Sequence, residues 1–223
     1  MILAYALVGT ALANPLGARQ AAQDFTGNTQ NGLMQGACKS AIVIFARGTT
    51  EGGNVGTLAG PPTFQAIAQK IGPQNLAVQG VEYPADVPGF LDGGDKAGSK
   101  TMADLVTKAI STCPKSNIVM AGYSQGCQLV HNAAKALPAA TTGKTAALCF
   151  GDPDNGQPVQ GVPAAKTKII CHADDNICQG GSQIKQAHLT YGKQDAGEAA
   201  SFVASLVAAG NGTTGAATGR QKH

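Results

Sequence analysis

Short apolar runs alternate along the chain with longer segments in which apolar residues recur at helical spacing. Nearly continuous apolar runs are typical of strands covered on both faces of a parallel sheet. Five such runs are Ser40 to Phe45, Leu76 to Val81, Asn117 to Ala121, Thr145 to Phe150 and Lys168 to Cys171. Helical patterns occupy about 62–71, 95–112, 124–137 and 195–209. Strands that alternate with helices predict an α/β fold, here a three-layer α/β/α sandwich around a five-stranded parallel sheet.

The last helical pattern has both a start signal and an apolar face. Asp195 with Glu198 three residues later resembles a capping box, and an apolar stripe follows. The segment from Gly210 is rich in Gly, Thr and Ala and predicts a flexible tail, which contains the glycosylation sequon Asn211-Gly212-Thr213. The expected organisation is a signal peptide over 1–13, a polar leader over 14–36, one α/β domain over 37–209 and a tail over 210–223.

The composition limits the class of protein. The 223 residues are 43% hydrophobic and only 13% charged, with a formal net charge of +3. Such a chain buries a full core, which excludes intrinsic disorder, a fibrous repeat or a miniprotein held by disulfides alone. No run of Lys or Arg offers the basic surface that a phosphate backbone requires, so we expect no nucleic-acid partner. We also expect a monomer without a cofactor.

The N-terminus predicts export. Residues 1–13 are apolar or small, and Ala11-Leu12-Ala13 matches an A-x-A cleavage pattern before Asn14. The run is shorter than the roughly 20 residues that span a bilayer, so a signal peptide is favoured over a membrane helix. We therefore expect a secreted, extracellular protein without stable membrane insertion.

A nucleophile-elbow motif follows the third predicted strand. The strand runs into Gly122-Tyr123-Ser124-Gln125-Gly126, and a helical stretch comes next. In the G-x-S-x-G pattern the serine sits on a strained turn, and the glycines let strand and helix approach closely. The helix N-terminus beside it favours negative charge on a reacting oxygen. An ordinary serine in a glycine-rich turn is the alternative, but the strand–turn–helix context favours Ser124 as a nucleophile.

A nucleophilic serine needs a histidine base, which comes late in this fold and after the acid. His131 lies two turns up the helix from Ser124, and His223 ends the tail. His172 precedes any acid that its own loop supplies. His188 therefore remains as the candidate base.

The acid is less sharply indicated. Asp152 and Asp154 follow the fourth strand, and Asp174 and Asp175 follow the fifth. Asp175 lies in the short loop between Cys171 and Cys178, where a disulfide would hold its carboxylate toward an imidazole. Position alone separates it only weakly from Asp174.

Four segments carry a resemblance to a known family. They are Ala46-Arg47-Gly48-Thr49-Thr50-Glu51, Gly122-Tyr123-Ser124-Gln125-Gly126, Cys171-His172-Ala173-Asp174-Asp175-Asn176-Ile177-Cys178 and His188-Leu189-Thr190-Tyr191-Gly192. Their order and spacing resemble those of the fungal cutinases, over about Cys38 to Ala209. Cutinases are secreted, lidless serine esterases of the α/β-hydrolase type that cut the polyester of plant cuticle and other short or insoluble esters. The resemblance implies Ser124 as nucleophile, His188 as base and Asp175 as acid.

An oxyanion hole is the other requirement of acyl transfer. One donor should be the backbone N–H of Gln125, because it follows the nucleophile. The second should come from the loop after the first strand. In cutinases a serine follows the Arg-Gly pair there, and this chain has Thr49 instead, which keeps both the N–H and a hydroxyl. Arg47 is expected to be structural, paired with a carboxylate such as that of Glu51.

The six cysteines are an even number, consistent with disulfides. Cys38 and Cys113 each precede a strand, which places both at the amino edge of a parallel sheet, and the cutinase pattern agrees with a bridge between them. Proximity predicts a second bridge, Cys171 to Cys178. Cys127 and Cys149 either form a third bridge, which we slightly favour, or pack as free thiols. No cluster has metal-ligand spacing, so no metal site is expected.

Two loops are expected to flank Ser124 and to bind substrate. One carries Val87, Phe90 and Leu91, and the other carries Ile184. An apolar rim suits an insoluble aliphatic ester, so cutin and short-to-medium acyl esters are the expected substrates.

Two other functions remain open. The second loop also contains Ser182, Gln183, Lys185 and Gln186, a polarity that keeps acetylxylan esterase as the alternative enzyme. A secreted surface-binding module without turnover is a third possibility, disfavoured because such a module has no reason to keep a complete triad.

Overall fold

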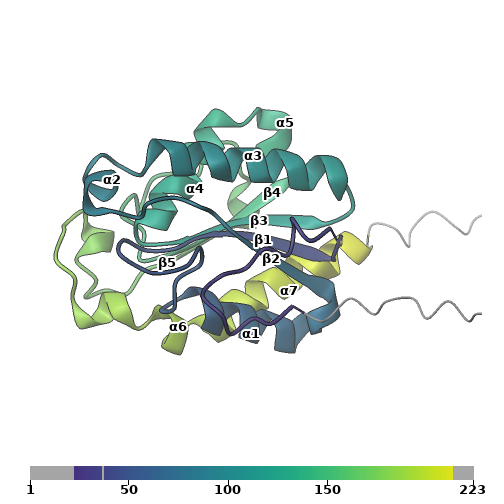
Figure 1. The fold of residues 1–223 in the computed structure, drawn as a ribbon, viewed down its shortest axis with the longest axis horizontal. Helices are drawn as coiled ribbons and strands as arrows, with labels where there is room; N and C mark the ends of the chain where they lie inside the picture. The colour runs from purple at the N-terminus through teal and green to yellow at the C-terminus, as the bar shows by residue number, and fades with distance from the viewer. Residues whose placement is uncertain (1–22, 37, 213–223) are drawn as a thin grey trace, which may run out of the picture.

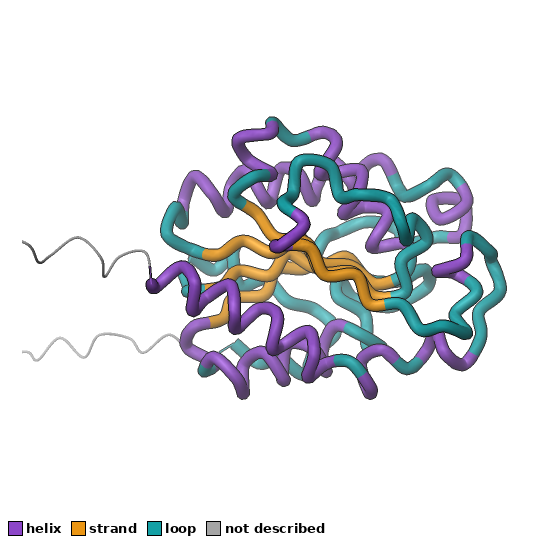
Figure 2. The backbone as a smooth tube through the Cα atoms, turned by 180° about the vertical axis from the view of Figure 1, so that it is seen from behind, coloured by secondary structure: helices purple, strands orange, loops and turns teal. Residues whose placement is uncertain are grey.

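A parallel five-stranded sheet forms the centre of the molecule, in a computed structural model that describes residues 23–36 and 38–212. The strand order is β2-β1-β3-β4-β5, and Figure 2 shows the strands between two layers of helices. The strands are β1 (Ala41–Ala46), β2 (Leu76–Gly80), β3 (Asn117–Tyr123), β4 (Thr145–Phe150) and β5 (Thr167–Ile170). All five agree closely with the runs predicted from the sequence. β1 to β4 are almost wholly buried, and β5 is partly buried at the edge of the sheet.

The helices cover both faces of the sheet, as Figure 1 shows. One face carries α3 (Lys96–Thr112), α4 (Gln125–Ala136) and α5 (Ala139–Thr142). The other face carries α1 (Gly60–Ile71), α6 (Tyr191–Gln194) and α7 (Ala196–Gly212). The apolar core is accordingly split into two clusters, one on each side of the sheet. This is the predicted three-layer sandwich, in which the carboxyl ends of all five strands meet at one edge.

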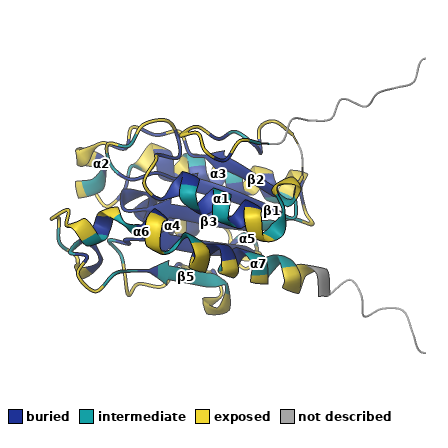
Figure 3. Cartoon of the chain, turned by 90° about the horizontal axis from the view of Figure 1, so that it is seen from below, coloured by how far each residue is buried: buried dark blue, intermediate teal, exposed yellow. Residues whose placement is uncertain are grey.

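Figure 3 shows the inner strands buried between helices that expose their outward faces, with β5 only partly buried. None of the helices in the described part of the chain is long and apolar enough to cross a membrane. The predicted signal peptide, the remainder of the leader before residue 23 and the tail beyond residue 212 lie outside the described residues, as does Thr213 of the sequon.

A short helix absent from the sequence prediction lies at the carboxyl edge. Helix α2 (Val87–Leu91) begins at Asp86, whose Oδ1 accepts a hydrogen bond of 2.8 Å from the N–H of Gly89. Pro88 occupies an early position, where its missing N–H costs nothing. A Pro-Gly pair usually marks a loop, and here the aspartate cap, together with hydrogen bonds from Gln125 and Gln128 of α4, stabilises a helical turn.

The predicted capping box of the last helix does not form. The Asp195 carboxylate accepts a hydrogen bond of 2.7 Å from His172 Nε2, and Glu198 forms an ion pair with Lys168 of β5. Both acids therefore tie the start of α7 to neighbouring segments.

The described part of the leader belongs to the folded domain. Phe25 and Leu33 are buried in the two core clusters, and Gly32 N donates to Val78 O at 2.7 Å. An antiparallel bridge joins Asn31 to Gln79 of β2. Residues 23–36 therefore cover the outer edge of β2, although the sequence analysis places the domain boundary after them.

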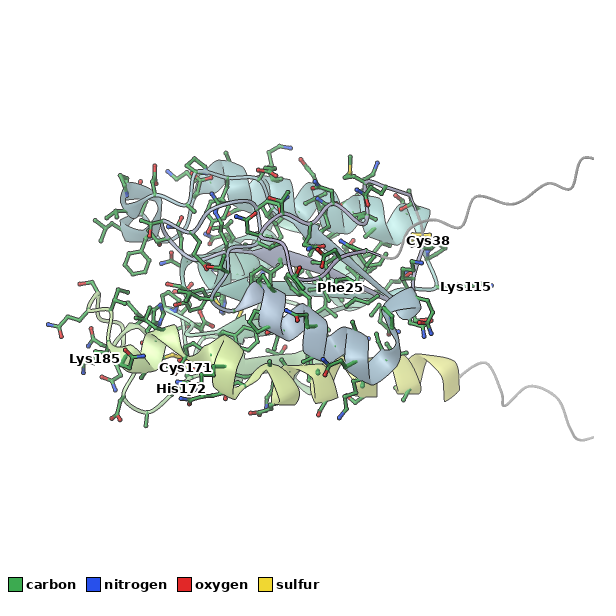
Figure 4. The ribbon with its side chains drawn as sticks, turned by 60° about the horizontal axis from the view of Figure 1, so that its bottom comes forward. Phe25, Cys38, Lys115, Cys171, His172 and Lys185 are labelled. Atoms are coloured by element: carbon green, nitrogen blue, oxygen red, sulfur yellow. A yellow bond between two sulfur atoms is a disulfide. The ribbon has the colours of Figure 1, made fainter. Side chains whose placement is uncertain are left out.

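Two of the three expected disulfides are present. Cys38–Cys113 and Cys171–Cys178 are bridged, and Figure 4 shows Cys38 and Cys171 toward opposite ends of the molecule. The expected third bridge is wrong, because Cys127 and Cys149 are free thiols, both fully buried. The Cys127 Sγ donates to Phe150 O at 3.3 Å, so this thiol has a backbone partner.

Candidate active site

Ser124 occupies a strained turn between β3 and α4. Its backbone angles are φ 56° and ψ −123°, a conformation that non-glycine residues rarely adopt. A Cβ atom at Gly126 would collide with the carbonyl of Ala46, and one at Gly122 would collide with the backbone of Gly126. Both glycines of the motif are therefore required by the close approach of strand and helix.

The first turn of α4 gives this serine an electropositive setting. The N–H of Gln125 opens the helix and belongs to the first four amides, which have no partner within it. The helix dipole adds partial positive charge at the same end. A developing negative charge next to Ser124 is thus favoured.

Asp175 and His188 come together from two parts of the long connection between β5 and α7. His188 Nδ1 lies 2.8 Å from Asp175 Oδ2, and both side chains are buried. Asp174 is exposed, and Asp152 bonds to His131 instead. Of the four aspartates that the sequence left open, only Asp175 contacts His188 among the contacts described.

The other nitrogen of His188 lies at the same site as the serine. His188 Nε2 is buried and has no hydrogen-bond partner among the described residues. Ser124 and His188 line one cavity. The backbone of His188 is held by Tyr123, the residue before the serine, whose hydroxyl donates to His188 O at 2.8 Å. The imidazole is thus fixed on its Nδ1 side and free to take a proton on its Nε2 side.

The Gln125 side chain links two walls of the site. Its Nε2 donates to Thr49 Oγ1 and to Asp86 O, each at 2.8 Å. Thr49 therefore has its hydroxyl oxygen held in place, while its hydroxyl proton remains available to another acceptor. Thr50, the next residue, has a φ of 67° and donates from its N–H to Ala85 O at 2.7 Å.

Arg47 is structural, but its partners differ from the expected ones. Its Nε donates to the backbone carbonyl of Glu51 at 2.6 Å, and its Nη2 donates to Tyr83 O at 2.8 Å. The Glu51 carboxylate instead accepts from the N–H groups of Gly48, Thr57 and Leu58. The pair holds the loop after β1 through the backbone rather than through a salt bridge.

An apolar cavity of about 480 Å³ opens in front of Ser124. All four predicted binding residues line it: Val87, Phe90, Leu91 and Ile184. Leu58 and Leu189 line it as well, and both are exposed. No sequence pattern indicated these two residues, although Leu189 directly follows His188. Thr49 also lines the cavity, and Asp175 lies behind the imidazole.

A second buried His–Asp pair lies outside this cavity. His131 Nε2 and Asp152 Oδ2 are 3.0 Å apart, with the ligand atoms of His131, Asp152 and Asp154 within 4.8 Å of one another. Sequence spacing did not indicate this cluster. Because His131 and Asp152 satisfy each other, the pair joins α4 to the loop after β4.

Comparisons with known proteins agree with this geometry. A family model described as Cutinase matches residues 37–207. A cutinase of Botryotinia fuckeliana is 62% identical over 168 residues, which cover 75% of this chain and 83% of that protein. A cutinase of Pyrenopeziza brassicae is 47% identical over 197 residues, which cover 88% of this chain and 91% of that one.

A solved structure shares the fold. A Trichoderma reesei cutinase in complex with a phosphonate inhibitor superposes with a TM-score of 0.76 at 45% identity, and the match covers 82% of this chain and 81% of that one. With the family model spanning most of the sequence, the chain belongs to the cutinase family and is a carboxylic ester hydrolase.

Proposed function

We propose that the protein cleaves carboxylic esters through a Ser124–His188–Asp175 triad. His188 Nε2 takes the proton of the Ser124 hydroxyl as the oxygen attacks the ester carbonyl. Asp175 holds the imidazole in the tautomer that leaves Nε2 open and stabilises the imidazolium that forms. His188 then protonates the leaving alcohol, and water repeats the sequence on the acyl-enzyme.

The oxyanion hole completes this mechanism. The N–H groups of Gln125 and Thr49 donate to the oxygen of the tetrahedral intermediate, and the Thr49 hydroxyl reinforces them. The helix N-terminus at Gln125 favours the same charge.

One observation carries the proposal: the His188 imidazole is anchored on Nδ1 by Asp175 and carries an unpartnered Nε2 at the cavity that Ser124 lines. An unpaired buried nitrogen costs about 1–3 kcal/mol, which a merely structural histidine has no reason to bear.

The test is Ser124→Ala. We expect a normally folded variant that loses nearly all turnover of p-nitrophenyl butyrate, with a residual rate about 10³-fold above water from binding and the oxyanion hole. A fluorophosphonate probe should label the wild type and not the variant. Near-wild-type turnover by Ser124→Ala would refute the triad, and failure of the wild type to label would favour a binding module.

We propose cutin and short-to-medium acyl esters as the substrates. The apolar cavity and its exposed rim support this choice, since each buried methylene of an acyl chain contributes about 0.8 kcal/mol until the cavity is full. Butyrate or hexanoate esters should therefore exceed acetate in kcat/KM. The double variant Val87→Ser/Ile184→Ser should flatten this preference, measured as kcat/KM across the p-nitrophenyl ester series.

The alternative, acetylxylan esterase, is favoured by the exposed polar side chains of the loop that carries Ile184, among them Ser182, which lines the cavity. Release of acetate from acetylated xylan, with no hydroxy fatty acid released from cutin, would decide for it.

Secretion is part of the same proposal. The two disulfides support an oxidising compartment, because such bonds are rare where thiols are kept reduced. Expression of the full chain in a fungal host should place the protein in the medium, with its N-terminus at Asn14. Retention in the cell with residues 1–13 intact would contradict this.

A further inference from the structure

The acid of the proposed triad has a second side-chain donor. Asp175 Oδ2 accepts from the Tyr191 hydroxyl at 2.6 Å as well as from His188 Nδ1. Its other oxygen, Oδ1, accepts from the N–H of Ile177 at 3.0 Å. Burial, followed by the bond to Asp175, raises the pKa of Tyr191 above its ordinary value, so this hydroxyl keeps its proton and donates. The carboxylate is thus oriented from three directions.

Tyr191 is itself held by His172. The His172 ring stacks on the Tyr191 ring with centroids 4.1 Å apart and planes at 19°. The backbone N–H of His172 donates to the Tyr191 hydroxyl oxygen at 3.0 Å, which aims the hydroxyl proton at Asp175. Figure 4 shows His172 beside Cys171, close to the start of α7.

The His172 ring also joins three segments of chain. Its Nδ1 lies 2.9 Å from the carbonyl oxygen of Ala187, the residue before His188, and its Nε2 lies 2.7 Å from Asp195 Oδ2. A carbonyl oxygen only accepts, so Nδ1 donates to Ala187, while the contact at Nε2 pairs the ring with the Asp195 carboxyl group. The ring therefore clamps the loop that carries His188 and the start of α7 to the loop that carries Asp175.

We propose that Tyr191 and His172 are positioning residues for ester hydrolysis. Tyr191 orients the Asp175 carboxylate toward His188, and His172 holds Tyr191 and the loop that carries His188 in place. The inference rests on the proposed triad. Its physical basis is that proton transfer demands close alignment, and that a displacement of about 1 Å costs up to 10²-fold in rate.

The decisive variant is Tyr191→Phe, which removes one hydroxyl and keeps the stacked ring. We expect kcat on p-nitrophenyl butyrate to fall about ten- to hundredfold, with KM within about twofold because Tyr191 does not line the cavity. The downfield proton resonance of His188 Nδ1–H should shift, since Asp175 Oδ2 loses its second donor. If Tyr191 had only a structural role, Tyr191→Phe would neither lower kcat without a change in KM nor shift this resonance.

Two substitutions of Asp195 test the role of His172 independently of Tyr191. Asp195→Asn keeps an oxygen acceptor for His172 and should retain most of kcat, whereas Asp195→Ala should lose about tenfold. The matched control is His131→Gln, in a buried His–Asp pair that does not line the cavity. This control should lower the melting temperature and leave both kcat and the His188 resonance unchanged.

The outcomes separate the two proposals. If Ser124→Ala is inactive while Tyr191→Phe keeps wild-type kcat and an unmoved resonance, the positioning role is wrong and the triad stands. Equal kcat in Asp195→Asn and Asp195→Ala overturns the clamp, and it does so even if Tyr191→Phe fails to fold. Activity in Ser124→Ala removes the triad on which both roles rest.

Discussion

Thr50, Ala85 and Ser124 hold a positive φ, and within the described residues they are the only non-glycine positions that do. Ser124 and Thr50 line the cavity, and Ala85 accepts the hydrogen bond of Thr50 N. Each such residue costs about 1–3 kcal/mol and persists only where its surroundings enforce it. At Ser124 the enforcement is visible, because its N–H donates to Phe150 O and its carbonyl accepts from Cys127 N. Strain is thus concentrated where the hydroxyl must project.

Replacing Thr49 tests the oxyanion hole at one atom. Thr49→Val keeps the shape and the backbone N–H but removes the hydroxyl that Gln125 Nε2 holds. We expect kcat to fall about 10²-fold, the cost of one oxyanion donor. Thr49→Ser should retain activity, as measured by steady-state hydrolysis of a soluble butyrate ester. A wild-type kcat in Thr49→Val would mean that the backbone N–H groups alone suffice to stabilise the oxyanion.

The two free thiols should be unreactive in the native protein. Burial raises the pKa of Cys127 and of Cys149, and the thiolate is the reactive form. Raising the pH to 9 should therefore produce little labelling by a thiol reagent, although an exposed cysteine would be largely ionised there. Unfolding without reductant should release two reactive thiols per chain. A titre of zero would mean that a third disulfide exists in solution.

The loop between β5 and α7 is the element that brings most of the proposed machinery together. It contains the Cys171–Cys178 bridge, Asp175, and the 3₁₀ turn η4 (Gln186–Leu189) with His188. It has little regular structure, so side-chain hydrogen bonds and the disulfide hold its shape. Small displacements within this element are therefore expected to affect turnover before they affect global stability.

The double variant Cys171→Ser/Cys178→Ser tests that expectation. Closing so short a loop contributes about 2.5 kcal/mol of chain entropy, against about 4.5 kcal/mol for the long loop closed by Cys38 and Cys113. We expect the variant to lose more than tenfold in kcat through misplacement of Asp175. Cys38→Ser/Cys113→Ser is the control and should lose more stability but less activity, measured by urea unfolding and initial rates. The reverse pattern would show that the short bridge has no positional role.

At the scale of the whole molecule, the two edges of the sheet are protected in different ways. Residues 23–36 cover β2, and β5 forms the other edge with four residues that include Lys168. Short edges and edge lysines are known obstacles to pairing between molecules. This arrangement supports the expectation of a monomer.

Removal of residues before Gln35 tests the covered edge. The deletion loses the buried side chains of Phe25 and Leu33, which should cost roughly 3–6 kcal/mol at about 1.5–3 kcal/mol each. It also uncovers the backbone of β2, so we expect aggregation at concentrations where the longer chain stays monomeric. Light scattering and urea unfolding measure the two effects. Unchanged stability would mean that this segment is only loosely attached.

Sequence alone predicts the sheet well and the site in outline. Buried parallel strands are continuous apolar runs, and Ser124 carries a local motif, so both are visible in the order of residues. The bond between Tyr191 and Asp175, and the clamp of His172 on Ala187, depend on where loops fold in three dimensions. The spacing of apolar and polar residues along the chain does not predict such contacts. The same holds for Asp195, whose local pattern indicates a helix cap but whose carboxylate finds a stronger partner in His172.

The position of the Cys38–Cys113 bridge has a kinetic consequence. Strand β1 pairs with β3 from Ala41 opposite Asn117, and Asn117 N donates to Ser40 O directly beside the bridge. The crosslink thus closes the same long loop that the central strand pairing must close. Parallel pairings of this sequence separation are slow to form, because the search for the distant strand precedes any gain in contacts. In an unfolded chain with this bridge intact, the starts of β1 and β3 are already held close together. Such a chain should therefore refold much faster than the fully reduced chain.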